Sequence, residues 1–228
     1  MNTQTATRAV VHKLKVARAL IDTGMFEPLR PDRTLQSVVA LRRWGATPAG
    51  AYTGAAARHP ARLALIDERG ALSFREVQRR TNALAHELRK AGIGAGDGVA
   101  IMCRNHRGFV EATVACSKLG AGALFLNTAF AGPQITDVLA REQPVAVIYD
   151  DEFSGLVSAG AEGRLRFIAW QEGGASPPEP TLEQLIARGD DSDLAPPPEK
   201  GRIVILASGT TEAKWRATES MSATRLWR

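Results

Sequence analysis

Hydrophobic and polar positions near the start of the chain repeat with the period of a helix. Over residues 8–21 apolar side chains recur three or four positions apart, and this predicts an amphipathic, basic helix. Such a helix is compatible with a membrane-surface anchor, an organellar presequence or a leader packed on the domain, and we favour the packed leader. The apolar positions are Val10, Val11, Leu14, Ala17, Leu20 and Ile21, and the basic ones are Arg8, Lys13, Lys15 and Arg18.

Two helices and a hairpin are predicted next. The helices cover residues 32–43 and 49–58, and the short strands cover residues 63–66 and 71–73. Ser73, with Glu76 three residues later, forms the capping-box pattern that opens another helix. The face of that helix expected to be buried consists of Phe74, Val77, Thr81, Leu84, Ala85 and Leu88.

Strands and helices then alternate along the chain. Short apolar runs bounded by turn residues predict strands over residues 99–102, 123–126, 145–149, 166–170 and 202–206, and helices over 107–119 and 134–141. This order requires right-handed crossovers between parallel strands. We therefore predict an α/β fold with a mostly parallel sheet, helices on both faces and a helical leader.

Acidic residues gather in two loops. Residues 171–200 are rich in Gly, Pro and acids, and Thr181 and Gln184 form a capping pattern for one short helix among them. The acids of this segment lack the spacing of a cation site, so we interpret them as a solvated loop. The same interpretation applies to the acids after the strand at 145–149. The two groups are Asp190, Asp191 and Asp193, and Asp150, Asp151 and Glu152.

Composition and charge exclude some classes of function. The 228 residues, 44% of them hydrophobic, suffice for one core, and no run is long enough to span a membrane or patterned as a secretory signal. We expect a cytoplasmic protein, with weak membrane-surface contact through residues 8–21 as a further expectation. The net charge of +5 divides into +5 over residues 1–45, −3 over 46–200 and +3 over 201–228, which argues against a nucleic-acid partner. Cys103 and Cys116 lack metal-ligand spacing and are expected to be buried thiols.

The segment after the last of these strands carries the chemistry. Ser208, Gly209, Thr210 and Thr211 combine a glycine with three hydroxyl side chains. Glycine lets successive backbone N–H groups converge, and the hydroxyl groups can donate to phosphate oxygens. The carboxyl edge of a parallel sheet is also where ligands bind. An ordinary turn has the same composition, so spacing alone leaves both interpretations open.

Short motifs in a fixed order add a family resemblance. They include Ala64-Leu65-Ile66-Asp67, Leu72-Ser73-Phe74-Arg75-Glu76-Val77, Lys118-Leu119-Gly120-Ala121 and Leu126-Asn127. Their order and spacing resemble the adenylate-forming superfamily of AMP-dependent synthetases and ligases, bacterial fatty-acid-CoA ligases especially. Residues 204–211 resemble the start of that family's phosphate-loop signature. The resemblance covers about residues 48–211.

This resemblance implies a fold, a reaction and a set of binding residues. It implies a leader at residues 1–45, an incomplete N-terminal domain of the adenylate-forming fold at 46–211, and an aberrant tail at 212–228. It implies an acid–thiol ligase that uses ATP, Mg²⁺ and coenzyme A to activate a fatty acid, first as an acyl-adenylate and then as a thioester. The phosphates of ATP would be bound by Ser208, Gly209, Thr210, Thr211 and Lys214. No catalytic residue or metal ligand of the family has a counterpart in this chain.

Several polar residues are assigned to the scaffold instead. Asn105 and His106 follow a predicted strand and are interpreted as residues that cap or orient a turn. His59 and His86 fall on predicted helices and are expected to have no partners.

The family pattern stops after Thr211. Glu212 stands where the family has glycine, and a one-residue gap is needed to keep Lys214 as the loop lysine. Residues 212–228 show neither strand alternation nor a helical stripe, so we expect disorder there. We expect a truncated or frameshifted fragment with little or no ligase activity alone. The alternatives are a non-catalytic remnant or interaction module that binds no nucleotide, and a small nucleotide-binding protein.

Overall fold

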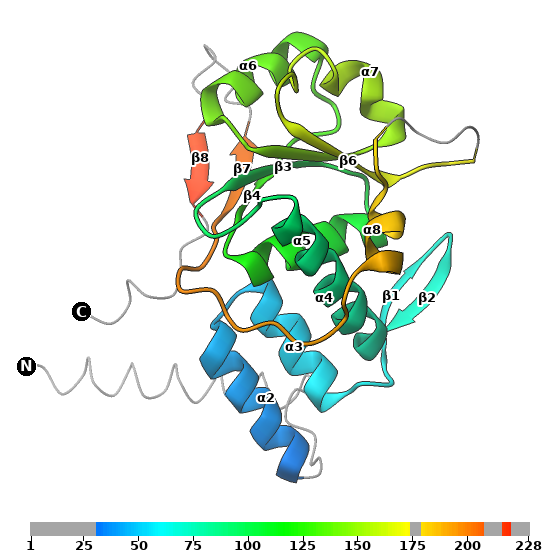
Figure 1. The fold of residues 1–228 in the computed structure, drawn as a ribbon, viewed down its shortest axis with the longest axis vertical. Coiled ribbons are helices and arrows are strands. Elements are labelled where there is room, and N and C mark those ends of the chain that lie inside the picture. The colour runs from blue at the N-terminus through cyan, green and yellow to red at the C-terminus, as the bar shows by residue number, and fades with distance from the viewer. Residues whose placement is uncertain (1–30, 174–178, 208–215, 220–228) are drawn as a thin grey trace, which may run out of the picture.

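The computed structural model describes residues 31–173, 179–207 and 216–219 (Figure 1). The predicted helix over residues 8–21 lies outside these ranges. The helices are α2 (Pro31–Trp44), α3 (Pro48–Arg58), α4 (Phe74–Lys90), α5 (Arg107–Leu119), α6 (Gly132–Glu142), α7 (Ser154–Val157) and α8 (Leu182–Arg188), with a 3-10 turn over Asp151–Phe153. The strands are β1 (Leu63–Asp67), β2 (Gly70–Ser73), β3 (Gly98–Met102), β4 (Gly122–Phe125), β5 (Ala146–Asp150), β6 (Leu165–Trp170), β7 (Ile203–Ala207) and β8 (Arg216–Glu219).

The main sheet has six strands in the order β6-β5-β3-β4-β7-β8. The five strands from β6 to β7 are parallel to their neighbours, while β1 and β2 form a separate antiparallel hairpin. Each strand that the sequence predicted is present within one residue of its expected ends. The predicted mostly parallel sheet is therefore confirmed, and the 3-10 turn, α7 and β8 are short elements that the sequence did not predict.

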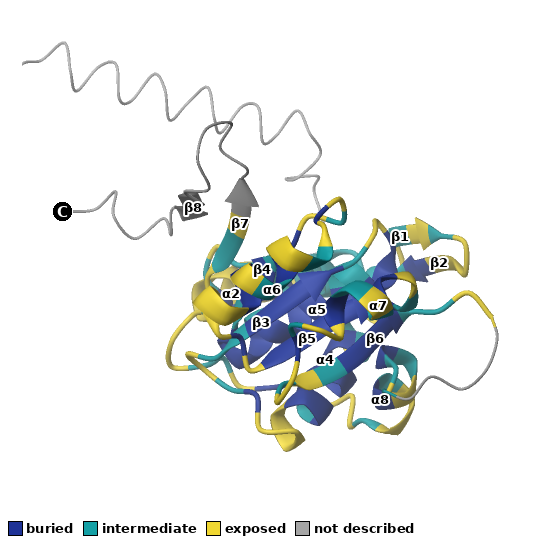
Figure 2. Ribbon diagram, turned by 90° about the horizontal axis from the view of Figure 1, so that it is seen from above, coloured by how far each residue is buried: buried dark blue, intermediate teal, exposed yellow. Residues whose placement is uncertain are grey.

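Helices cover the sheet from both sides, as predicted (Figure 1). Val99 and Ile101 of β3 belong to a buried cluster that includes side chains of α4 and α5. The alternate residues Ala100 and Met102 belong to a second cluster, to which α6 contributes three side chains. The strands at the centre of Figure 2 are therefore buried on both faces, and this explains why they read as nearly continuous apolar runs in the sequence.

Helix α4 begins as the capping pattern predicted. The backbone N–H of Ser73 donates to Oε2 of Glu76 at 2.7 Å, and the N–H of Glu76 donates to Oγ of Ser73 at 3.3 Å. Five of the six residues predicted on the buried face are buried, and Phe74 is only partly buried. Phe74 is the first helical residue and lies beside the Tyr52 ring of α3, with 6.2 Å between ring centroids.

Helices α2 and α3 pack together below the sheet in the view of Figure 1. Ala40 and Trp44 of α2 and Ala49 of α3 join the same buried cluster as α5. Thr47 caps α3, because its side chain accepts a hydrogen bond from the N–H of Gly50 at 3.1 Å. The proposed domain boundary between residues 45 and 46 stays a prediction.

Strand β8 corrects the expectation for the tail. Residues 212–228 were expected to lack regular structure, but Arg216–Glu219 pairs antiparallel with β7, placing Val204 opposite Glu219 and Ala207 opposite Arg216. This pairing uses backbone hydrogen bonds, which satisfy the otherwise open edge of β7 and need no apolar alternation in the added strand. The other residues of the tail lie outside the described ranges.

Two expectations from composition concern thiols and membranes. Cys116 is fully buried, and burial raises its pKa to about 12, whereas Cys103 is only partly buried. The prediction of buried thiols is thus confirmed for Cys116 alone. Within the described ranges, no helix has the length and apolarity that crossing a membrane requires.

Candidate functional site

Strand β7 leads the chain into the segment that the sequence singled out. It pairs in parallel with β4, with Ala123 opposite Ile203 and Phe125 opposite Ile205. Because β7 ends at Ala207, the chain enters the segment from the carboxyl edge of the sheet. The predicted phosphate-binding residues themselves lie outside the described ranges, and their role stays a prediction: Ser208, Gly209, Thr210, Thr211 and Lys214.

The strand next to β7 ends in a polar turn. After β4, Oδ1 of Asn127 accepts a hydrogen bond from the N–H of Ala129 at 2.9 Å, and the Asn127 carbonyl accepts one from Phe130 at 3.0 Å. Residues 126–131 contain no acidic side chain. A polyphosphate beside β4 would therefore meet amide and hydroxyl groups without like-charge repulsion. This part of the edge fits the anion that the neighbouring segment is predicted to bind.

A buried polar cluster occupies the same edge at β3, β5 and β6. His106 is the N-cap of α5: its Nδ1 accepts a hydrogen bond from the N–H of Gly108 at 3.1 Å, so its Nε2 donates to Oδ1 of Asp150 at 2.9 Å. The imidazole stacks on Trp170, with 4.6 Å between ring centroids. The prediction that His106 caps a turn is confirmed.

Asp150 was wrongly interpreted as part of a solvated loop. It is 3% exposed, and its Oδ2 accepts a hydrogen bond from the N–H of Arg104 at 2.7 Å. Strand β5 lies beside β3, which brings Asp150 next to the residues that follow β3. The sequence does not show which strands are neighbours in the sheet, so it could not predict the contact between His106 and Asp150. Burial, with Asp150 nearby, also raises the pKa of the Cys103 thiol.

This cluster is separated from the end of β7. Adjacent strands are about 4.8 Å apart, so β3 lies roughly 10 Å and β5 roughly 14 Å from β7. The cluster instead contacts the β1–β2 hairpin. Arg69 lies in the turn of that hairpin, and its guanidinium is 3.8 Å from the centroid of the Trp170 ring at the end of β6. We assign His106 and Asp150 to the scaffold and not to the phosphate site.

Charged groups buried between α4 and α5 were not predicted. Lys118 is fully buried, and its Nζ donates to Oγ1 of Thr81 at 2.8 Å and to Oδ1 of Asn82 at 2.5 Å. Burial lowers the pKa of Lys118 to about 7. Glu111 is also buried and pairs with Arg80 at 2.5 Å, and its burial raises its pKa. The signal in the sequence was a charged side chain among the apolar positions of the helix predicted at 107–119.

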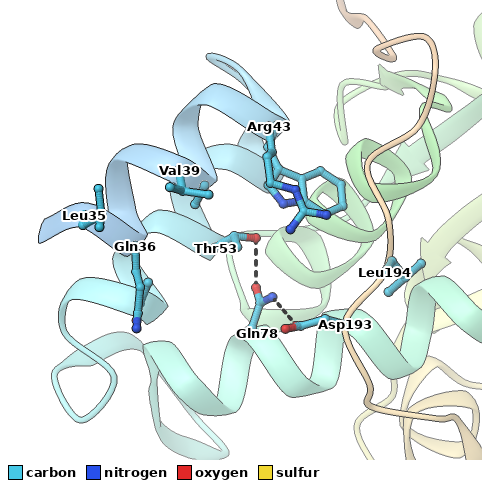
Figure 3. A pocket seen from close by; sticks show the side chains of 11 residues that line it. Leu35, Gln36, Val39, Arg43, Thr53, Gln78, Asp193 and Leu194 are labelled. Carbon is cyan, nitrogen blue, oxygen red and sulfur yellow. Dashed lines mark hydrogen bonds between the residues drawn. The ribbon is translucent and has the colours of Figure 1, made fainter. Parts of the chain in front are cut away.

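The acids after α8 are exposed, as predicted, but they are bound to α4. Oδ1 of Asp193 accepts a hydrogen bond from Gln78 at 3.2 Å (Figure 3). It also accepts one from Asn82 at 3.1 Å, and Asp191 accepts one from Arg79 at 2.6 Å. Among the described residues, no group of three or more His, Cys, Asp or Glu side chains could hold a metal ion. These residues do not fit the Mg²⁺ ion that the family resemblance implies.

The two helical histidines have partners, contrary to expectation. Nε2 of His86 lies 3.3 Å from the carbonyl oxygen of Ser192. His59 is the C-cap of α3, and its backbone N–H donates to the carbonyl of Ala55 at 2.7 Å. The His86 contact depends on a loop far along the chain, and the His59 contact depends on how α3 ends. The periodicity of apolar residues predicts neither.

Cavities among the helices of the described residues lie away from the carboxyl edge of the sheet, and two of them involve α2. The one in Figure 3 has a volume of about 360 Å³ and is lined by residues of α2, α3 and α4 and by Asp193 and Leu194. The other, of about 500 Å³, is lined by residues of α2 and α3 and by Arg62 and Phe74. No lining residue of either cavity follows a parallel strand, so neither is the predicted nucleotide site.

Comparison with known families tests the resemblance that the motifs suggested. Residues 52–212, more than half of the chain, match the family of AMP-binding enzymes. The chain belongs to this family. The resemblance to adenylate-forming enzymes is thereby confirmed. Residues 208–211 fall within the matching part of this AMP-binding protein, whereas Lys214 lies beyond it.

Relatives of this AMP-binding protein are named for different acids. It is 36% identical over 110 residues to a feruloyl-CoA synthase from Amycolatopsis, a match covering 48% of the chain and 22% of the relative. It is 29% identical over 182 residues to long-chain fatty acid transport protein 1 from mouse, covering 75% of the chain and 28% of the relative. The chain thus spans roughly a quarter of the length of these relatives.

Solved structures of CoA ligases share the fold. A fatty acyl CoA synthetase from Mycobacterium tuberculosis has a TM-score of 0.63 at 19% identity, covering 77% of this chain and 34% of that one. A benzoate CoA ligase from Burkholderia xenovorans has a TM-score of 0.62 at 17% identity, covering 79% and 35%. The N-terminal domain of FACL13 from Mycobacterium tuberculosis, solved separately, has a TM-score of 0.63 at 20% identity, covering 76% and 44%. The α/β fold is that of the N-terminal part of adenylate-forming enzymes.

Proposed function

We propose that this chain corresponds to the N-terminal part of an ATP-dependent acyl-CoA ligase and binds the phosphates of ATP with the segment after β7. In the reaction, a carboxylate oxygen attacks the α-phosphorus of ATP and pyrophosphate leaves. The sulfur of coenzyme A then attacks the acyl carbon, and AMP leaves. The chain's own part is to hold the β and γ phosphates, where fixed donors stabilise the charge that develops on pyrophosphate.

One observation carries the proposal. A parallel strand of an AMP-binding family member runs directly into a glycine flanked by three hydroxyl side chains, at the sheet edge where ligands of α/β proteins bind. The adjacent turn at residues 126–131 adds amide and hydroxyl groups and no carboxylate. We assign phosphate binding to Ser208, Gly209, Thr210, Thr211 and Lys214.

A fatty acid is the substrate that we propose, and an aromatic acid is the second candidate. The motif pattern most resembles fatty-acid-CoA ligases, and the match to a long-chain fatty acid transport protein covers three quarters of the chain. The match to a feruloyl-CoA synthase covers fewer residues but has a higher sequence identity, and it favours an aryl acid. ATP–pyrophosphate exchange is measured with octanoate, palmitate, benzoate and ferulate. Exchange stimulated by the first two acids supports a fatty acid substrate, and exchange stimulated by the last two supports an aromatic acid.

Phosphate binding is tested by titrating the chain with ATP, AMP and inorganic tripolyphosphate. We expect ATP to bind more tightly than AMP and tripolyphosphate to compete with ATP, since the segment holds the outer phosphates. Ser208→Ala and Thr210→Ala should each weaken ATP binding about tenfold, which is the usual effect of losing a hydrogen bond to a charged group. Ser158→Ala, at an exposed hydroxyl outside the segment, should leave binding unchanged. Equal affinity for ATP and AMP would contradict the assignment.

Glu212→Gly should strengthen ATP binding at least about fivefold. Glu212 places a carboxylate beside the proposed phosphate site, and at 4 Å each unit of like charge costs about 1 kcal/mol in water and more where water is excluded. The same substitution should raise any pyrophosphate exchange. Glu172→Gly removes an equal charge from an exposed loop and serves as the control. Unchanged ATP affinity in Glu212→Gly would show that residue 212 lies away from the bound phosphates.

The alternative function is a non-catalytic module that keeps part of the fold. It is favoured by Glu212 and by the absence of a metal-binding cluster from the described residues. If neither the chain nor Glu212→Gly binds ATP in the titration or catalyses pyrophosphate exchange, this alternative is supported over the ligase.

A further inference from the structure

Helix α2 carries large apolar side chains both on the side that packs against the protein and on exposed positions. Ala40 and Trp44 are buried against the rest of the chain. Leu35 is 65% exposed, Val38 48% and Val39 44%. A surface helix normally presents charged or polar residues on its outer side, so three large apolar side chains there require a reason.

The exposed residues form one stripe. At 100° per residue, Leu35, Val38 and Val39 fall within an arc of about 100°, on the side opposite Ala40 and Trp44. We call these three residues the outer stripe of α2. Leu35 and Val39 also line the cavity in Figure 3. The stripe is a continuous strip and not a set of isolated side chains.

Basic side chains flank this stripe. Arg42 and Arg43 are exposed in the last turn, where Arg42 continues the stripe and Arg43 lies beside it, and Asp32 is the acidic residue of the helix. Leu41, on another side of α2, is 50% exposed. It lines the cavity of about 500 Å³ together with Arg58, His59 and Arg62. The segment before α2 repeats this chemistry, because residues 1–30 carry five basic and two acidic side chains around an apolar pattern.

We propose that the outer stripe of α2 docks on the surface of an anionic lipid bilayer. An apolar stripe flanked by arginines is what an interfacial helix needs: the leucine and valine side chains enter the boundary of the acyl chains while the guanidinium groups meet lipid phosphates. Anionic lipid is favoured over a second copy of α2 or over residues 8–21, because each of those carries a net positive charge of its own. This inference is independent of the proposed ligase function.

Flotation of the full chain with lipid vesicles tests the proposal. The chain is mixed with vesicles of phosphatidylcholine containing phosphatidylglycerol, or of phosphatidylcholine alone, and centrifuged through a density gradient so that aggregated protein sinks and bound protein floats. We expect flotation with the anionic vesicles, reduced by salt, and little with the neutral ones. Equal binding to both, or no binding, overturns the proposal.

Matched variants assign the binding to α2. The triple variant Leu35→Ser, Val38→Ser, Val39→Ser should lower the partition coefficient at least about tenfold. Ile66→Ser, at a residue 75% exposed on β1, should leave it unchanged. Arg42→Glu should lower binding about fivefold or more, whereas Arg89→Glu, also exposed in the last turn of a helix, should not. A triple variant that floats like the parent chain overturns the assignment to α2.

Two further measurements identify other occupants of the stripe. If the chain without residues 1–30 floats and the full chain does not, the preceding segment covers the stripe and the proposal is wrong. If the full chain forms a dimer that the triple variant abolishes, and neither floats, the stripe binds a second copy. Circular dichroism of each variant verifies that the fold is intact, as expected for changes at exposed positions.

Discussion

Asp67→Ala is expected to lower the free energy of unfolding by about 3–5 kcal/mol. Asp67 is the last residue of β1. Its carboxylate accepts hydrogen bonds from Nη2 of Arg107 at 2.6 Å and from the Arg107 backbone N–H at 3.0 Å. Their side chains are 4% and 9% exposed. Removing the acid leaves a buried guanidinium without its counter-charge, and this accounts for most of the loss.

Urea denaturation followed by circular dichroism measures the effect. Glu142→Ala is the control, because it removes one side of an ion pair with Arg141 whose side chains are 32% and 41% exposed, and it should cost about 0–1 kcal/mol. A loss in Asp67→Ala no larger than in the control would show that the buried pair contributes little.

The same pair predicts a dependence of stability on acid. The hydrogen bonds from Arg107 lower the pKa of Asp67 to about 2, below its value of 3.8 in an unfolded chain. Between these values the unfolded state binds more protons, so stability present above pH 4 is lost as the pH falls toward 2. This contribution is about 2 kcal/mol and should be missing from Asp67→Ala.

Lys118→Met is expected to destabilise the fold by about 1–3 kcal/mol. Nζ of Lys118 connects α5 to α4 by donating to Thr81, Asn82 and both the carbonyl and the side-chain oxygen of Gln78. Methionine has a similar length but no donor, so these buried acceptors would lose their partner. Lys90→Met is the control, since Lys90 is 66% exposed in its pair with Glu87 and should cost less than about 1 kcal/mol.

A pH titration distinguishes the buried lysine from a merely apolar contact. Burial lowers the pKa of Lys118 to about 7, whereas the unfolded chain holds this proton up to about 10.4. The unfolded state therefore binds more protons between these values, and stability should rise with pH from about 7 to about 10. The rise should disappear in Lys118→Met and persist in Lys90→Met. A Lys118→Met variant as stable as the control would show that α4 and α5 are held by apolar packing alone.

The sequence determined where the elements begin and end. Helix α5 covers the residues predicted for it, and α4 opens at the Ser73 cap, because both boundaries depend on side chains a few residues apart. Phosphate binding was also inferred from local chemistry, a glycine among hydroxyl groups after a buried strand. Strand β8 was missed because pairing at a sheet edge uses backbone groups, which leave no side-chain pattern.

Only the tertiary structure decided which distant residues meet. The strand order placed Asp150 beside His106, and the packing of α5 on α4 enclosed Lys118 among four acceptors. It also showed that the outer stripe of α2 faces away from the core, although the sequence marks those residues as apolar. Periodicity reports one element at a time, whereas burial depends on which elements pack together. That choice is made by contacts between residues far apart in the chain.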